Sequence, residues 1–515
     1  MGEAIIQFYK QKVKKEWKLA FFITFAVALL THLYKLTNTL LNHDSVYNYY
    51  NKQNMVGSGR WALSAACGIG SYFDLPWLNG LLCCLYIALT AVVIVALFRL
   101  KNPVLIGLSG ALLAVAPAVT ETLFFNFTAD GYFLAMLLAA LAVFLSRMEE
   151  KRWYFLLLSG VCVCVSCGIY QAYVSFGLVL AVCYLMDQLL QGKQDKKSCW
   201  LWVLRQVIIY AGALAAYYVI WKLCMRVSGV SAVDYQGISK VEFSVAVIAG
   251  GFLRSVRIVL LYFTQWNIVE HGLTFYSVIN LLFLAALLVG LVIACVRSGV
   301  YRKKWAMVLL ILCVATWLPF TCIWNFTSAM VVYRPMMLVG LVVLFIFGAI
   351  LYERWGKLVL KNAMCLLLVL IVFQNVLMAN MSYFYMHKCQ QWTYAEGIEM
   401  MVRIHQLQDE QQIDKIAVLG YRPMEVALDF FDEENGGVAP AGKLFMLSSQ
   451  LETSLLLSHE HTVRYLKETY GLEIPSLDTV SRAALEERQE VKEMPCWPAG
   501  DSMTVIDGVL IIKLA

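Results

Sequence analysis

The chain has 515 residues, of which 60% are hydrophobic and 15% charged, with a formal net charge of +6 and a mean hydropathy of +0.67. A soluble globular protein carries about 25% charged and about 45–50% apolar residues, so this chain needs lipid as part of its solvent. The composition argues against a soluble enzyme, a secreted disulfide scaffold, a disordered protein and a nucleic-acid-binding protein. Most of the fifteen cysteines lie inside apolar runs, where they behave as small hydrophobic residues.

Apolar runs long enough to cross a bilayer as helices recur from the N-terminus onward. They predict eleven transmembrane helices near 19–37, 76–98, 103–120, 129–146, 153–169, 172–190, 200–221, 275–296, 305–322, 334–352 and 362–383. Short basic connections alternate with mostly longer connections of mixed charge, and the stretch before the first run is also basic. The positive-inside rule then places the N-terminus in the cytoplasm and the C-terminus outside.

The sequence predicts two domains. Residues 1–383 form the transmembrane domain, with outer loops at 38–75 and 222–274, and 244–264 is interpreted as an amphipathic helix along the outer surface. Residues 384–515 form a small extracytoplasmic α/β or α+β domain. Its expected strands are 415–420 and 509–514, its expected helices are 400–412 and 463–470, and turns are expected at 435–437 and 495–498.

The first outer loop carries the residue types that glycosyl transfer requires. Asp44 follows the first span and is suited to accept a proton from an alcohol. Arg60 can hold a phosphate through two parallel hydrogen bonds. Nearby polar and aromatic side chains that suit a sugar are His43, Tyr47, Asn48 and Trp61. An interfacial loop whose aromatic residues sit among lipid headgroups is the alternative.

Further candidates lie at the outer ends of other spans. The sugar or acceptor could be contacted by Glu121, Asp130, Tyr170 and Gln171, and the donor phosphate by Arg254, Arg257 and Arg334. Acidic residues at membrane level tend to be functional, although Asp130 could instead cap the next helix. Arg254 and Arg257 could equally form the solvated face of a surface helix, and Arg334 could snorkel.

Several nucleotide and metal motifs are missing from the sequence. It has no Walker loop, no glycine-rich dinucleotide motif, no H-E-x-x-H and no paired CxxC. The short cytoplasmic connections leave no room for a domain that binds a nucleotide sugar. We therefore expect an activated sugar that is already outside, such as one linked to a lipid phosphate.

Motifs along most of the chain resemble the bacterial GtrII-type glucosyl transferase family. They are NHDSVYN at 42–48, GRW at 59–61, DLPWLNG at 74–80, ADGY at 129–132, GIYQA at 168–172 and MPCWP at 494–498. The resemblance implies a GT-C-like polytopic membrane glycosyltransferase of the bacterial cytoplasmic membrane. Such an enzyme would move a hexose, expected to be glucose, from an undecaprenyl-phosphate-linked donor to a surface glycan. A separate enzyme would make this donor and a flippase would deliver it.

The resemblance also implies that the catalytic base is an acid of the first outer loop, which here is Asp44. Many relatives carry an acidic pair where this chain has His43 and Asp44. This departure argues against a metal-binding pair at that position. A divalent cation is kept as an open alternative, and no metal ligands or other cofactor are assigned.

Two alternatives from the sequence stay open. A lipid-linked glycan flippase or transporter would place its polar residues midway across the bundle, often on broken helices in matching halves. A polysaccharide polymerase would use the same class of donor and is favoured by a large outer loop between late spans. Here the polar residues cluster at the outer ends and the loop at 323–333 is short, which favours the glycosyltransferase.

Overall fold

The computed structural model describes residues 13–233, 244–264, 275–328, 331, 333–422 and 455–514. The chain forms two compact units. The first comprises Met1–Thr37 and Asn51–Asn380, and the second comprises Asn38–Tyr50 and Met381–Ala515. Residues 38–50, which carry Asp44, thus belong to the same unit as the C-terminal domain.

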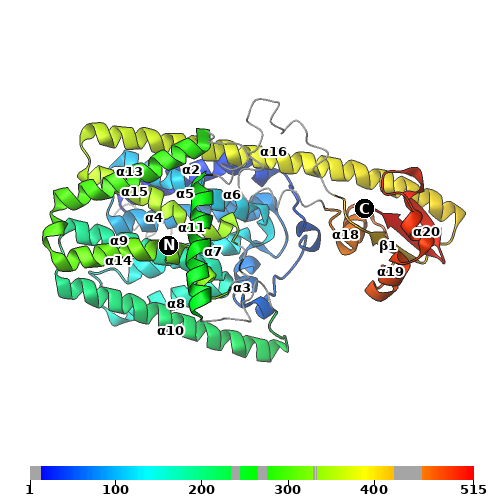
Figure 1. Ribbon diagram of the computed structural model, residues 1–515, viewed down its shortest axis with the longest axis horizontal. Coiled ribbons are helices and arrows are strands. Elements are labelled where there is room, and N and C mark those ends of the chain that lie inside the picture. The colour runs from blue at the N-terminus through cyan, green and yellow to red at the C-terminus, as the bar shows by residue number, and fades with distance from the viewer. Residues whose placement is uncertain are drawn as a thin grey trace, which may run out of the picture. The chain divides into compact units, whose positions relative to one another are not determined.

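The first unit is helical (Figure 1). Its helices are α2 (Lys15–Thr37), α3 (Leu63–Cys67), α4 (Pro76–Phe98), α5 (Pro103–Ala114), α6 (Pro117–Phe124), α7 (Asn126–Leu145), α8 (Trp153–Ile169), α9 (Val174–Gln191), α10 (Lys196–Ser228), α11 (Val245–Thr264), α13 (Phe275–Ser298), α14 (Lys304–Thr321) and α15 (Leu341–Trp355). They are followed by α16 (Leu358–Glu410), whose residues belong to both units.

Local sequence explains where several of these helices begin and end. Proline is the first residue of α4, α5 and α6, a position where its missing N–H costs no hydrogen bond. The Asn102 side chain accepts from the N–H of Val104 at 2.9 Å and so caps α5. Gly192 ends α9 in the left-handed conformation that glycine adopts without strain.

Eleven helices in the described part of the chain are long and apolar enough to cross a membrane, as the sequence predicts. The chain is therefore a multi-pass membrane protein, consistent with the GT-C-like class. The set differs from the predicted one in two members. Helix α8, predicted as a span, has only 17 residues and is too short to be counted. Helix α11, interpreted from the sequence as a surface helix, is long and apolar enough to cross a membrane. In Figure 1, α11 runs across the direction of α13 and α14, the long helices that it contacts.

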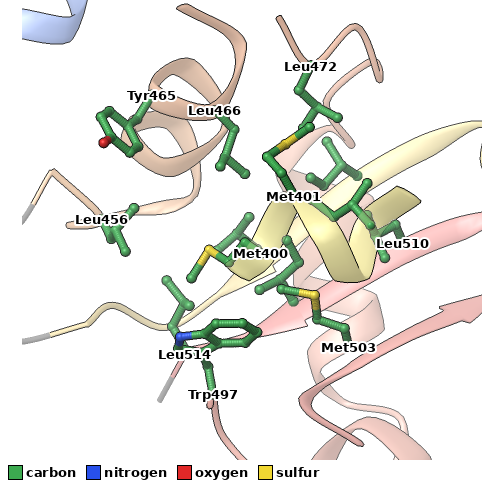
Figure 2. Packing of buried hydrophobic residues seen from close by; sticks show 14 of the residues in the cluster. Met400, Met401, Leu456, Tyr465, Leu466, Leu472, Trp497, Met503, Leu510 and Leu514 are labelled. Carbon is green, nitrogen blue, oxygen red and sulfur yellow. The ribbon is translucent and has the colours of Figure 1, made fainter. Parts of the chain in front are cut away.

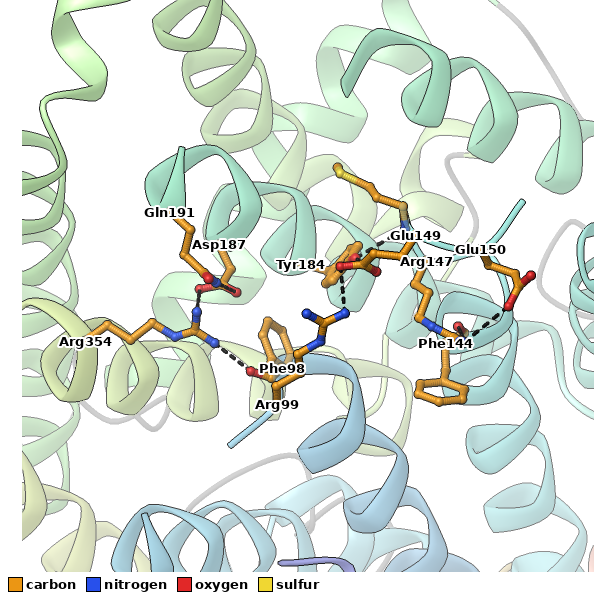
Figure 3. A network of polar contacts seen from close by, with 11 residues as sticks. Phe98, Arg99, Phe144, Arg147, Glu149, Glu150, Tyr184, Asp187, Gln191 and Arg354 are labelled. Carbon is orange, nitrogen blue, oxygen red and sulfur yellow. Dashed lines mark hydrogen bonds and ion pairs between the residues drawn. The ribbon is translucent and has the colours of Figure 1, made fainter. Parts of the chain in front are cut away.

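A polar network lies at the ends of α4, α9 and α15 in the first unit (Figure 3). Arg354 of α15 pairs with Asp187 of α9 at 3.1 Å and donates to the carbonyl of Phe98 at 2.6 Å. Asp187, which is 3% exposed, also accepts from Gln191 at 2.7 Å. Nearby, Arg99 pairs with Glu149 at 2.9 Å. Because a buried charge is stable only when it is paired, this network fixes the register of α4, α9 and α15.

The second unit is a small α+β domain. Its sheet has the order β1 (Lys415–Leu419), β3 (Val509–Lys513), β2 (Met503–Ile506), with β3 parallel to β1 and antiparallel to β2. Its other helices are α18 (His459–Tyr470), α19 (Thr479–Glu486) and α20 (Gln489–Glu493). Both predicted strands are confirmed, and the predicted helix 463–470 is the later part of α18.

One prediction about this region is wrong. The span 362–383 and the helix 400–412 are not separate elements but parts of the continuous α16, 53 residues long. The residues between them include no proline, so every residue there can donate its backbone N–H to the helical hydrogen-bond pattern. The expected turn at 435–437 lies outside the described residues, and residues 495–498 form a turn as predicted.

An apolar core holds the second unit together (Figure 2). Met400, Met401 and Ile404 of α16 pack against the sheet and α18. Val46, from the segment that follows the first span, is fully buried in the same core. The turn that presents Asp44 is therefore anchored in the core of the C-terminal domain.

Candidate active site

Asp44 lies on a short turn whose backbone is fixed by its own side chains. Oδ1 of Asn42 accepts from the backbone N–H groups of Asp44 and Ser45, each at 3.0 Å. The amide of Asn48 donates to the carbonyl of Asp44 at 2.7 Å. The next residues form the short 3-10 helix η1 (Ser45–Tyr47), which buries Val46. The carboxylate is left 46% exposed, which suits a group that must meet a substrate.

Two imidazoles lie near the Asp44 carboxylate and its turn, one from His43 within the turn and one from His461 of α18. Nε2 of His43 lies 3.5 Å from Oδ2 of Asp44. His461, in the first turn of α18, has its ring centroid 6.4 Å from that of His43 and 5.0 Å from that of Tyr47. Nδ1 of His461 is hydrogen-bonded to the Ser458 hydroxyl at 2.9 Å. Burial lowers the pKa of His461, although the negative charge of Asp44 opposes this shift.

His461 is a residue that the sequence interpretation missed. The signal was present as the triplet His459-Glu460-His461, but it lies more than half the chain away from Asp44 and has no spacing that links the two. No group of three or more His, Cys, Asp or Glu side chains that could hold a metal occurs within the described ranges.

The other predicted residues belong to the first unit, and Arg60 lies at the centre of one group of them. Its Nη1 donates to the Tyr132 hydroxyl at 3.0 Å, and its guanidinium lies 4.9 Å from the centroid of the Tyr170 ring. The rings of Tyr132 and Tyr170 are stacked with centroids 4.3 Å apart. The cation is thus oriented by a hydrogen bond and by an aromatic face.

Gln171 and Trp61 join this group through the loop that carries Arg60. The Gln171 amide donates to the carbonyl of Ser58 at 2.9 Å and to the Tyr217 hydroxyl at 3.0 Å. The indole of Trp61 lies against Gly168, where a Cβ atom would come within 2.5 Å of the ring. The motifs at 59–61, 129–132 and 168–172, which are far apart in the sequence, therefore meet in space.

Asp130 lies in the second turn of α7 and is 1% exposed. Its Oδ1 accepts from the N–H of Gly131 at 2.8 Å. The alternative that Asp130 caps the helix is wrong, because α7 begins at Asn126 and its cap is Phe125. The Asp130 carboxylate is therefore enclosed by protein rather than open to a substrate.

Glu121 and Arg334 form a separate group. The Glu121 carboxylate is fully buried, and its Oε2 accepts from the backbone N–H of Met336. Its Oε1 has no hydrogen-bond partner within the described residues, and Arg334 acts on it electrostatically. Met336 Sδ in turn lies 3.6 Å from the Tyr170 hydroxyl, so this group adjoins the Arg60 cluster.

Arg254 and Arg257 differ in their surroundings. Arg254 donates to the backbone carbonyls of Asn325 at 2.8 Å and Ser328 at 3.4 Å, which joins α11 to the segment after α14. Arg257 is exposed. Arg254 therefore already has carbonyl partners, whereas Arg257 presents its charge to the surroundings.

Comparison with known proteins assigns the sequence to one family. The family model described as Glucosyl transferase GtrII matches residues 33–353. This range includes the Asp44 turn, the Arg60 cluster and the Glu121 group. No curated protein and no solved structure matches the chain. The match covers more than half of the sequence, and the chain belongs to the glucosyl transferase GtrII family.

Proposed function

We propose that this glycosyltransferase moves glucose from a polyprenyl-phosphate donor to a surface glycan outside the bacterial cytoplasmic membrane, with Asp44 as the general base. The observation that carries the proposal is the half-exposed Asp44 carboxylate on a turn fixed by Asn42 and Val46. A base must reach the acceptor hydroxyl while its own position stays constant. The orientation, with the N-terminus inside and the C-terminus outside, follows from the basic connections and belongs to the proposal.

The reaction follows from these groups. Asp44 accepts the proton of the acceptor hydroxyl while that oxygen bonds to the anomeric carbon, and the bond from this carbon to the lipid phosphate breaks. In-line attack inverts the anomeric centre. The leaving phosphate is already a stable anion, so a second carboxyl group acting as general acid is not needed, unlike in glycoside hydrolysis.

Arg60 is the cation best suited to the donor phosphate. Its guanidinium is oriented by Tyr132 and Tyr170, and a planar guanidinium binds phosphate through parallel hydrogen bonds. Among the other candidates, Arg257 is exposed, whereas Arg254 is committed to carbonyl groups. Glu121 and Asp130 are enclosed, so we assign them to support of the site rather than to contact with sugar.

The test uses the full chain purified in nanodiscs with a panel of polyprenyl-phosphate sugars and surface polysaccharide as acceptor. Transfer of radiolabelled glucose is expected, and Asp44→Asn should reduce it by about 10²–10⁴-fold, as expected for loss of a general base. Asp409→Asn, a change of the same kind at an exposed residue of α16, should leave transfer intact. A fully active Asp44→Asn enzyme would contradict the assignment. Movement of the lipid across the bilayer of sealed proteoliposomes without transfer would favour the flippase alternative.

A further inference from the structure

A cleft of about 460 Å³ opens in the second unit, close in the chain to the Asp44 turn. Its volume falls within the range of about 300–1,000 Å³ that is typical of ligand pockets. Three elements build it: the segment 38–41 with Tyr49, the part of α16 from His387 to Tyr394, and Tyr465 and Thr469 of α18. Segments at both ends of the Asp44 turn thus form its walls.

The lining of this cleft has the chemistry of a saccharide site. It contains two side-chain amides of α16, Gln390 and Gln391, together with Asn38 and Thr469, and phenol rings from Tyr49 and Tyr394. Amides and hydroxyls can donate to and accept from sugar hydroxyls, and aromatic faces cover the apolar face of a sugar ring. Leu40 and Leu41 are the aliphatic members of the described lining.

The lack of strongly charged side chains in the lining indicates which of the two substrates binds in the cleft. None of the described residues that line the cleft is Asp, Glu, Lys or Arg, and its one imidazole is that of His387. A polyprenyl-phosphate donor carries a negative phosphate, which proteins hold with Arg or Lys, and a long apolar tail. A neutral polyhydroxyl chain needs neither, so the lining fits a glycan better than a lipid phosphate.

The cleft also lies within reach of the proposed base. Leu41 is three residues before Asp44, which limits their separation to about 11 Å of extended chain. Leu41 is itself fixed, since its N–H donates to Oε1 of Gln390 at 3.3 Å. A glycan in the cleft can therefore extend to the Asp44 carboxylate.

We propose that this cleft binds the acceptor glycan and presents one of its hydroxyl groups to Asp44, an inference that rests on the proposed function. The C-terminal domain is then a specificity element, because α16 and α18 supply most of the lining. Changes at exposed positions of these helices would alter which glycan is used.

The experiment measures the KM for acceptor and donor separately in the full chain. Tyr394, which is 51% exposed, is changed to Ala. Loss of its aromatic contact should raise the acceptor KM about fivefold, while the donor KM stays within about twofold. Thr469→Trp provides a second variant that fills the cleft from an exposed position of α18 and should have the same effect by steric exclusion. Tyr421→Ala, at a residue of the same unit that is 53% exposed and outside the cleft, should change neither KM.

Each outcome decides the inference. A raised donor KM with an unchanged acceptor KM would show that the cleft serves the lipid donor, and unchanged constants in both variants would overturn the inference altogether. If the wild-type chain releases sugar from no polyprenyl-phosphate donor, the proposed function has failed. In that event, equilibrium binding of the surface polysaccharide to the wild-type chain and to Tyr394→Ala still tests the cleft. Weaker binding to the variant supports a glycan site, whereas equal binding excludes it.

Discussion

The rings of His461 and Tyr47 pack against one another in a T-shaped arrangement, with their centroids 5.0 Å apart and the ring planes at 87°. Tyr47 ends the short helix that follows Asp44, and His461 lies in the first turn of α18. Through this contact the C-terminal domain supports the turn that carries the proposed base. His461 is accordingly a positioning residue for Asp44.

Replacement of His461 tests this relationship. His461→Ala should lower kcat about tenfold, because the Asp44 turn loses a neighbour that holds it, whereas KM for the donor should stay nearly constant. His461→Phe keeps an aromatic ring against Tyr47 and should recover most of the activity. His405→Ala, at an exposed residue of α16, is the control. If the Phe variant is as impaired as the Ala variant, the imidazole acts through its nitrogen atoms rather than through packing.

The sequence predicted the membrane helices well but not the assembly of the Asp44 turn. Hydropathy and proline positions locate α4 and α5 because burial in lipid and helix termination are local properties. The turn depends instead on contacts such as that between Leu41 and Gln390, which are 349 residues apart. The motifs at 59–61, 129–132 and 168–172 are recognisable one by one in the sequence. Their convergence on Arg60 depends on the packing of α7 against α8, which the spacing of the motifs does not predict.

Arg60 should be sensitive even to a change that keeps its charge. Arg60→Lys retains one positive charge but loses the planar guanidinium that stacks on Tyr170 and can bind phosphate through two hydrogen bonds. We expect glucosyl transfer to fall about tenfold or more, corresponding to loss of a charge-assisted hydrogen bond. Arg302→Lys, at an exposed arginine outside every candidate site, is the matched control. Steady-state kinetics in nanodiscs measure both, and equal activity of Arg60→Lys and wild type would remove Arg60 from the donor site.

The pair formed by Asp187 and Arg354 predicts a coupled effect on stability (Figure 3). Arg354→Met leaves the carboxylate of Asp187 buried without its partner and should lower the free energy of unfolding by about 3–5 kcal/mol. The double variant Asp187→Asn with Arg354→Met removes the charge as well, so it should be more stable than the single variant. Thermal unfolding in detergent compares the wild type, the two single variants Arg354→Met and Asp187→Asn, and the double variant. Additive losses would mean that the two side chains do not interact.

His459 predicts how the stability of the C-terminal domain depends on pH. Its Nδ1 accepts from the backbone N–H of Val418 in β1 at 2.9 Å, so the folded domain requires this nitrogen without a proton. Burial, assisted by the positive charge of Arg482, lowers the pKa of His459. An unfolded chain takes up the proton near its ordinary pKa of about 6.5, whereas the folded domain does so only at lower pH. The contribution of His459 to the free energy of unfolding should therefore be complete above a pH of about 6.5. It should fall as the pH drops toward the lowered pKa, by at most about 1.4 kcal/mol per pH unit for one proton.

His461 and Glu460 also titrate near His459, and their effects on the pH dependence of stability can be told apart from its own. Burial also lowers the pKa of His461, which adds a loss of stability in the same direction. Burial opposes a low pKa for Glu460, but hydrogen bonds, including those from Ser458 and Arg482, bring it to about 2, so its contribution is lost only at much lower pH. Asn at position 459 offers a side-chain oxygen to Val418 without titrating, and His459→Asn should therefore flatten the decline between pH 7.5 and 5.5. Pulse proteolysis of the full chain, with detection of C-terminal fragments, measures this. An equally steep decline in His459→Asn would assign the pH dependence to His461 instead.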